Sequence, residues 1–263
     1  MTGRGRVRRA VTLVALAMAP LLVGLAAAPG GTVSAEAPPG AGIPAVLGSC
    51  PAAGHAVALT FDDGWDETTT RRLVERLLAL RAPATFFPQG SAVRRWPALW
   101  RWIAASGFPL ADHTEDHPDL TRLPAAEAGA EVAAGLAAVA SVAATGRPPL
   151  AVLRPPYGAL DPAVLRAAAD AGIRLVVLWD VYGGDSEGWP ASKVAAAAEA
   201  GGDGSIIVLH AGPPATVAAI DGIVADYRAR GFELVTLPDL LARAGGAARC
   251  VLLDAPAVAR PTS

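Results

Sequence analysis

Apolar segments of two kinds alternate along the chain from Ala56 onward. Short apolar runs, typical of buried strands, are followed by longer segments in which apolar side chains recur at helical spacing. The predicted strands are 57–61, 85–87, 108–111, 151–154, 173–179, 205–210 and 232–237. The predicted helices are 68–80, 97–105, 124–145, 162–171 and 216–230. This alternation favours parallel strands joined by crossover helices, and therefore an α/β fold, either a (β/α) barrel or an open doubly wound sheet.

The first 35 residues have a different pattern. Arginines at positions 4, 6, 8 and 9 precede an uncharged stretch from Ala10 to Ala28, which is followed by small residues and prolines. This order indicates a secretory signal peptide over residues 1–35, cleaved after Ala35. An uncleaved membrane anchor is the alternative, because the uncharged stretch could just span a bilayer. We expect a secreted or cell-envelope protein that is free of the membrane once the signal is removed.

The rest of the chain divides into three parts. A Pro-, Gly- and Ala-rich stretch predicts a linker over residues 36–54, the folded domain is predicted over residues 55–245, and residues 246–263 form a predicted C-terminal tail. Cys50 and Cys250 lie just outside the two ends of that domain. In an oxidising compartment a disulfide between them would join the ends, and two free thiols are the alternative.

Composition excludes several classes of protein. The 263 residues are 52% hydrophobic with a formal charge of −2, which excludes a disordered chain, and the length suits one large domain. The chain has no run of basic residues in the predicted domain, which argues against a nucleic-acid partner. Four arginines and no acid lie in the predicted signal, so the mature protein is more acidic than the whole chain.

Polar side chains that could do chemistry follow the predicted strands where those strands end. In chain order they are Asp62, Asp63, His113, His117, Arg154, Asp180, Asp185 and His210. In a (β/α) barrel the C-terminal ends of all strands lie on one face, which is where the active site sits. We therefore expect these side chains to converge if the fold is a barrel.

The histidine pair and the acid pair together suggest a metal site. His113 and His117 are four residues apart, so one helical turn would place both imidazoles on the same side. Two imidazoles and one carboxylate, with positions left for water and substrate, make a catalytic metal site, and a solvated turn is the alternative. The adjacent Asp62 and Asp63 repel each other unless a cation compensates, so one could be a ligand and the other a base.

Four separated motifs resemble those of a known family. They are Thr60–Gly64, His113–Pro118, Arg154–Gly158 and Val208–His210, which occur in this order. In this order they resemble the polysaccharide deacetylases, the NodB-homology family also called carbohydrate esterase family 4, over roughly residues 56–241. The resemblance implies a deformed, TIM-barrel-like (β/α) barrel. It also implies a metal-dependent hydrolase that removes acetyl groups, usually from N-acetylated sugars in polymers such as peptidoglycan or chitin, and sometimes O-acetyl groups from xylan.

The resemblance also implies a metal site and its ligands. By motif position Asp63, His113 and His117 would hold a divalent metal, usually zinc, with cobalt or another divalent ion in some members. The metal would polarise the acetyl carbonyl and activate water. The expected partner is an acetylated glycan.

The remaining motif residues take catalytic roles by the same resemblance. Asp62 would be the general base, with Arg154 pairing to it and keeping it ionised. The backbone N–H of Tyr157 would stabilise the oxyanion together with the metal. His210 would be the general acid that gives a proton to the departing amine.

The chain departs from the family pattern in the segment Trp179–Trp189 and, to a smaller extent, at Val208, where the family usually has leucine. Gly188 stands where the family has an acid directly before a tryptophan, an acid that orients and charges the histidine. Trp189 can still form an apolar cleft wall against His210, but the carboxylate must come from Asp185 or Asp180, of which we prefer Asp185.

Trp65, directly after the acid pair, is predicted to line the substrate cleft. Two alternatives to a polysaccharide deacetylase remain. One is a catalytically weak member that binds glycan, suggested by the missing acid at position 188, and the other is a deacetylase or deformylase of a small amide.

Overall fold

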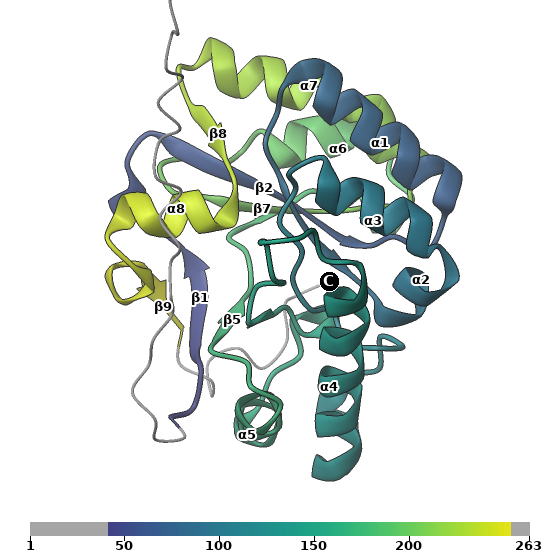
Figure 1. The fold of residues 1–263 in the computed structure, drawn as a ribbon. Helices are drawn as coiled ribbons and strands as arrows, with labels where there is room; N and C mark the ends of the chain where they lie inside the picture. Colours follow the sequence, from purple (N-terminus) through teal and green to yellow (C-terminus); the bar gives the residue numbers. More distant parts are fainter. Residues whose placement is uncertain (1–41, 254–263) are drawn as a thin grey trace, which may run out of the picture. The chain divides into compact units, whose positions relative to one another are not determined.

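The structure is a computed structural model that describes residues 42–253 (Figure 1), so the predicted signal peptide lies outside the described residues. The strands are β1 Ala45–Ser49, β2 Ala56–Asp63, β3 Thr85–Pro88, β4 Val152–Leu153, β5 Leu175–Val177, β6 Val181–Tyr182, β7 Ile206–His210, β8 Glu233–Val235 and β9 Val251–Leu252. The α-helices are α1 Glu67–Leu80, α2 Gly90–Arg95, α3 Pro97–Ala105, α4 Ala125–Val142, α5 Pro162–Asp170, α6 Ala191–Ala198, α7 Pro214–Ala229 and α8 Leu237–Ala244.

The strands form a deformed barrel made of two linked sheets. One sheet has the order β4-β5-β1-β9, and the other has β3-β2-β7-β6 with β8 pairing to the start of β2. Isolated parallel bridges, Phe86 with Leu110 and Asp112 with Leu153, connect β3 to β4 through the intervening chain. On the other side the chain runs from β5 in the first sheet directly into β6 in the second. The described strand pairs are parallel except for β1 with β9, as expected for a barrel built from βα units.

The helices pack side by side around the strands. Contacts connect α6 to α7, α7 to α1, α1 to α3, α3 and α2 to α4, and α4 to α5, and this succession can be followed in Figure 1. The helix α4 is alanine-rich, and its length and composition alone would allow it to cross a membrane. Its valines 132, 139 and 142 are buried in the hydrophobic core, so the apolar face of α4 is used for packing in this fold.

Side-chain alternation along β2 builds two parts of the core. Val57, Leu59 and Phe61 point outward and join the cluster packed under the helices. The intervening Ala56 and Ala58 point into the barrel, where they join residues from most of the other strands. The inward positions that follow are polar, and they carry the candidate active site.

Two segments predicted to lie outside the domain contribute strands. The predicted linker 36–54 contains β1, and the predicted tail 246–263 contains β9, which pairs with β1 in the antiparallel direction. Both predictions were wrong at these positions because the pairing of the two segments, which lie far apart in the chain, is not visible in local composition. A disulfide joins Cys50 to Cys250 next to this pairing.

Most main elements otherwise follow the predicted pattern, but the predicted strand 108–111 forms only an isolated bridge at Leu110, and short elements were missed. The helix α5 begins after Asp161, whose side chain accepts hydrogen bonds from two backbone N–H groups of the first turn. The structure adds α2, α6, α8 and β6, none of which the apolar pattern predicted. The predicted strand 173–179 is only three residues long as β5, after which the chain bends toward β6.

Candidate active site

A turn at the end of β2 brings two neighbouring carboxylates to the same site. Strict alternation would send Asp62 and Asp63 to opposite faces of the sheet. Asp63 instead has a left-handed φ of 72° and Gly64 one of 89°, so the chain turns over and both side chains are buried at the barrel mouth. A side chain at position 64 would also collide with the ring of Trp100, which explains the glycine.

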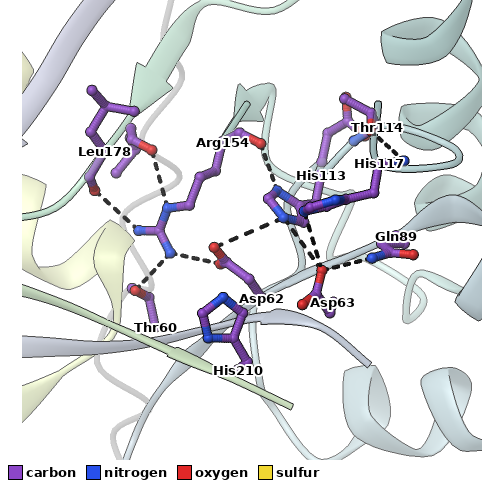
Figure 2. Close-up of polar contacts among 12 residues, drawn as sticks. Thr60, Asp62, Asp63, Gln89, His113, Thr114, His117, Arg154, Leu178 and His210 are labelled. Carbon is purple, nitrogen blue, oxygen red and sulfur yellow. Dashed lines mark hydrogen bonds and ion pairs between the residues drawn. The ribbon is translucent and has the colours of Figure 1, made fainter. Parts of the chain in front are cut away.

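Arg154 forms an ion pair with Asp62 and fixes the position of its carboxylate. Its guanidinium donates to Asp62 Oδ1 at 2.7 Å and to the Thr60 hydroxyl at 2.8 Å. It also donates to the backbone carbonyls of Val177 and Leu178 at the end of β5. Burial lowers the pKa of Arg154, while the charge of Asp62 and the hydrogen bond to it oppose that shift, and the guanidinium stays charged. The network, drawn in Figure 2, fixes one oxygen of Asp62 and leaves the other facing His113.

Asp63, His113 and His117 form a cluster with the spacing of a metal site. The Nε2 atoms of His113 and His117 each lie 3.6 Å from Oδ1 of Asp63, and one candidate ligand atom from each residue lies within 4.8 Å of the others. Figure 2 shows both imidazoles directed at this carboxylate. The predicted helical turn was wrong: residues 113–117 are not helical, and left-handed φ values at Thr114 and His117 bring the rings together instead.

The ionisation of these groups suits a divalent cation. His113 Nδ1 donates to the carbonyl oxygen of Arg154 at 2.7 Å, which leaves the lone pair on Nε2 facing Asp63. Burial lowers the pKa of His113, and burial together with the charge of His113 lowers the pKa of His117 to about 4. Burial raises the pKa of Asp63 and the charge of the neighbouring Asp62 adds to this shift, which a bound cation would oppose. Two neutral imidazoles and a carboxylate in this arrangement fit zinc or a similar ion.

His210 lies beside Asp62 because of the strand register, which pairs the two residues across β2 and β7. His210 Nδ1 donates to Oδ1 of Asp185 at 2.8 Å, and the backbone N–H of His210 donates to Oδ2 at 2.7 Å. Burial by itself would lower the pKa of His210, but the hydrogen bond and charge of Asp185, with Asp62 and Asp63 adding, raise it to about 9.

The structure therefore chooses between the two carboxylates that the sequence left open. Asp180 accepts hydrogen bonds from Ser205 and from the backbone N–H of Ile206 at the start of β7, away from His210. Asp185 is the residue that reaches His210, from a short turn between Gly184 and Gly188, which both have left-handed φ.

A cleft of about 980 Å³ lies over these groups. Its walls include Asp62, Asp63, Trp65, Gln89, His113, His117, Tyr157, Trp179, Tyr182, Glu187, Val208 and His210. Trp65 is 45% exposed and its ring centroid lies 6.5 Å from that of His210, so it lines the cleft as predicted. Trp189 does not: it packs on Gly184 and the core, with Lys193 over its ring. The prediction for Trp189 was wrong because residues 183–188 form a turn, after which the Trp189 side chain packs against the core and not at the cleft.

Several residues of the site were missed by the sequence analysis. Gln89 donates to Asp63 Oδ1 at 2.7 Å, the same oxygen that both histidines face. Trp179 and Tyr182 supply aromatic surface to the cleft instead of Trp189. All three follow strands directly or nearly so, so the strand-end rule used above contained the signal for them. Tyr157, which was predicted, lies at the cleft with a left-handed φ of 60° and its ring against His117.

Comparison with known proteins identifies the family. A family model described as polysaccharide deacetylase matches residues 51–176. The chitooligosaccharide deacetylase of Bradyrhizobium sp. (strain ANU 289) is 35% identical over 207 residues, which cover 71% of this chain and 90% of that protein. The chain belongs to the polysaccharide deacetylase family. The family resemblance predicted from the four motifs is therefore confirmed.

Solved polysaccharide deacetylases share the fold. A crystal structure of a peptidoglycan N-acetylglucosamine deacetylase has a TM-score of 0.69 at 28% identity, covering 74% of this chain and 92% of that one. A family 4 carbohydrate esterase from Streptomyces lividans has a TM-score of 0.63 at 31% identity, covering 70% and 91%. The predicted deformed (β/α) barrel is confirmed.

A longer relative extends the comparison. The peptidoglycan-N-acetylglucosamine deacetylase PgdA of Listeria monocytogenes (strain 10403S) is 32% identical over 191 residues, which cover 70% of this chain and 38% of that protein. The present chain therefore matches less than half of the length of PgdA.

Proposed function

We propose that this polysaccharide deacetylase is a metal-dependent hydrolase that removes N-acetyl groups from an acetylated glycan of the peptidoglycan or chitin type. One observation carries the proposal: an Asp62–Arg154 pair, an Asp63–His113–His117 cluster and a His210–Asp185 pair would not be expected to meet in one cleft by chance. The printed activities of the relatives, chitooligosaccharide and peptidoglycan N-acetylglucosamine deacetylation, support the same substrate class.

The site suits a divalent ion, and zinc is the ion that we propose. Asp63, His113 and His117 would hold it, with Asp62 close by but engaged by Arg154. When bound, the ion supplies Lewis acidity, which lowers the pKa of water and polarises an acetyl carbonyl. Cobalt or another divalent ion could replace zinc, because imidazole and carboxylate ligands accept several such ions.

Asp62 is proposed as the general base. Its Oδ1 is engaged by Arg154, so Oδ2, on the side of the metal cluster, is the oxygen that takes the proton from attacking water. The guanidinium of Arg154 holds the carboxylate in this orientation through its hydrogen bond to Oδ1.

Tyr157 is proposed to donate its backbone N–H to the acetyl oxygen as negative charge develops there. The two residues before it are prolines, which have no N–H, so Tyr157 offers the first backbone donor after Arg154. Its left-handed backbone and its place beside His117 support this role.

His210 is proposed as the general acid. With Nδ1 engaged by Asp185, its Nε2–H is the group available to protonate the departing amine. The raised pKa of about 9 keeps the imidazole protonated at neutral pH, which is the state that an acid requires.

We also propose that the protein acts outside the cytoplasm. The Cys50–Cys250 disulfide suits an oxidising compartment. The predicted signal peptide agrees with this location, although residues 1–35 lie outside the described part of the chain. Asp185 lies at His210 in place of an acid at position 188, which argues against the alternative of a member that binds glycan without turnover.

Release of acetate tests the proposal. Acetylated chito-oligosaccharides and peptidoglycan are incubated with the protein before and after chelation, and with Asp62→Asn as a control variant. We expect release that stops on chelation, returns with added zinc or cobalt, and falls by about 10²–10⁴-fold in Asp62→Asn while metal content is kept. Release that survives both treatments, or no release from any acetylated glycan by the metal-loaded protein, would overturn it.

A further inference from the structure

The segment that carries both histidines, Asp112–His117, lies between α2 and α4 with very little space around it. A Cβ at Gly90 in α2 would lie 2.1 Å from a carboxylate oxygen of Glu115. A Cβ at Gly135, in the middle of α4, would lie 2.3 Å from Asp112 Oδ1 and 2.5 Å from the backbone carbon of Thr114. Glycine is unfavourable inside a helix, so Gly135 within α4 indicates that close packing of the segment is needed, and Gly90 at the first position of α2 leaves room for Glu115.

The same segment has a backbone conformation that does not form by itself. Thr114 and His117 both have left-handed φ, at 63° and 62°, which costs conformational free energy for residues other than glycine. Such a conformation persists only where the surroundings impose it. The imidazoles of His113 and His117 meet because of these two residues, so whatever imposes the conformation also sets the geometry of the metal cluster.

Hydrogen bonds from both helices hold the segment. Backbone N–H groups at the start of α2 donate to the carbonyls of Thr114 and Glu115, at 2.8 and 2.9 Å. On the other side, Glu131 of α4 accepts the backbone N–H of Asp116 at 3.0 Å. The segment is therefore tied to one helix on each side.

Arg94 joins all three parts. From α2 its guanidinium donates to both carboxylate oxygens of Glu115, through Nε at 2.7 Å and through Nη2. Nη2 also donates to the carbonyl of Ala134 in α4 at 3.2 Å. The Glu115 side chain is 16% exposed and that of Arg94 is 52% exposed, so the pair is shielded from water on the carboxylate side, and its two-bond geometry distinguishes it from an ordinary surface pair.

We propose that the Arg94–Glu115 pair is a positioning device for the metal site: it fixes Asp112–His117 between α2 and α4 so that His113 and His117 are preorganised to bind the ion. Neither Arg94 nor Glu115 is among the proposed ligands, so the effect passes through the backbone of the segment. This inference rests on the metal site of the proposed function. It adds Arg94, which lies outside the four family motifs, and Glu115, which lies within one of them, as residues that would set the metal affinity.

The test compares metal affinity in two variants that lose the same kind of ion pair. Arg94→Ala removes the pair described above. Arg76→Ala removes a two-bond arginine–carboxylate pair with Asp221, which joins α1 to α7 away from the cleft. For each purified protein, zinc affinity is measured by competition with a chelator, and the visible absorption of the cobalt-loaded protein reports ligand geometry.

We expect Arg94→Ala to bind zinc about 10–100-fold more weakly and to change the cobalt spectrum, as is typical when groups that support metal ligands are removed. Arg76→Ala should keep the wild-type zinc affinity and spectrum even if its melting temperature falls. Arg94→Lys, which keeps the charge but not the two-bond geometry, should restore part of the affinity and keeps the test valid if Arg94→Ala does not fold.

The possible results separate the positioning role from the proposed metal site. Wild-type zinc affinity in Arg94→Ala, or an equal loss in Arg76→Ala, would overturn the positioning role while the proposed function stands. A wild-type protein that binds neither zinc nor cobalt would remove the proposed metal site, and the positioning role with it. Glu115→Ala should lose about as much zinc affinity as Arg94→Ala. If the double variant loses less than the sum of the two single losses, the result supports the Arg94–Glu115 pair as the positioning device.

Discussion

The Asp185 carboxylate is the residue on which the proposed acid depends most directly. It receives the imidazole and the backbone N–H of His210 through its two oxygens, and the hydroxyl of Thr216 as a third donor. Because the backbone N–H of His210 is one of the donors, the carboxylate stays in place whatever the imidazole does. Its hydrogen bond to the ring and its charge, with the charges of Asp62 and Asp63 adding, outweigh burial in the pKa of His210.

Removal of that charge should move the alkaline limit of activity. The general acid must be protonated, so activity falls as pH rises through the pKa of His210, which is about 9 in the wild type. In Asp185→Asn the hydrogen bond to Nδ1 can persist but the charge is lost, and burial then lowers the pKa. We expect the alkaline limb of kcat/KM to move down by about one pH unit or more, with reduced activity at pH 8, measured by acetate release across pH.

Asp180→Asn is the matched control for this prediction. Asp180 is the other carboxylate that the sequence offered, and it bonds to Ser205 and Ile206 instead of His210. The alkaline limb should stay in place in this variant even if the protein becomes less stable. Equal shifts in both variants would mean that Asp185 does not tune His210.

For single residues, it was easier to predict which polar residues lie at strand ends than how their side chains are oriented. The strand-end rule and the motifs pointed to the residues that the structure brings together at Asp63, because parallel strands end on one face. The conformation of His113–His117 was not predictable from spacing, since a four-residue interval fits a helical turn as well as a turn with left-handed residues. The prediction for Trp189 was wrong for a related reason: the direction of its side chain depends on the preceding turn, which contains three glycines.

Two glycines in one helix, α4, serve different purposes. Gly129 has only Ala167 Cβ near the position of a side chain, at 4.0 Å. Gly135 faces Asp112 and the backbone of Thr114 at less than van der Waals distance. Helix propensity treats the two positions alike, so their responses to alanine separate local propensity from packing against the histidine segment.

Gly135→Ala should therefore lower stability although it favours the helix. The added Cβ must displace backbone atoms of Thr114 at 2.5 and 2.6 Å, which cannot rotate away. We expect a loss of about 1–3 kcal/mol in the free energy of unfolding, measured by urea denaturation, together with weaker zinc binding. Gly129→Ala should gain about 0.5–1 kcal/mol and leave zinc binding unchanged. Gains in both variants would show that α4 does not press on the segment.

Element length explains most of the fold that sequence reasoning missed. Long helices with an apolar face, such as α1 and α7, were predicted to within a few residues. The strands β4, β6 and β9 have two residues each, too few for any alternation to be visible. Such strands exist because a neighbouring strand offers hydrogen bonds, and this depends on tertiary pairing instead of local pattern.

In the described part of the chain, the candidate site and the Cys50–Cys250 disulfide lie at opposite ends of the barrel. The candidate site lies at the C-terminal end of β2, whereas Cys50 donates its backbone N–H to Gly204 at the level of Ala56, where β2 begins. Six residues of strand separate Ala56 from Asp62, which is about 20 Å. The β1–β9 pair and the disulfide thus close the end of the barrel away from the cleft.

Loss of the disulfide should cost stability without changing the chemistry. The Cys50–Cys250 bond closes a loop of 200 residues, so it restricts the unfolded chain strongly, and both residues are buried. Cys50→Ala/Cys250→Ala should lower the free energy of unfolding by about 2–5 kcal/mol and the melting temperature by on the order of 5–15 °C. At temperatures well below the transition, kcat/KM should stay within about twofold of the wild type, because the substitutions lie about 20 Å from Asp62. Calorimetry and acetate release measure the two quantities. A thiol assay on denatured, unreduced wild type is the control, and two reactive thiols in it, or an unchanged melting temperature in the variant, would show that the bond does not stabilise the protein.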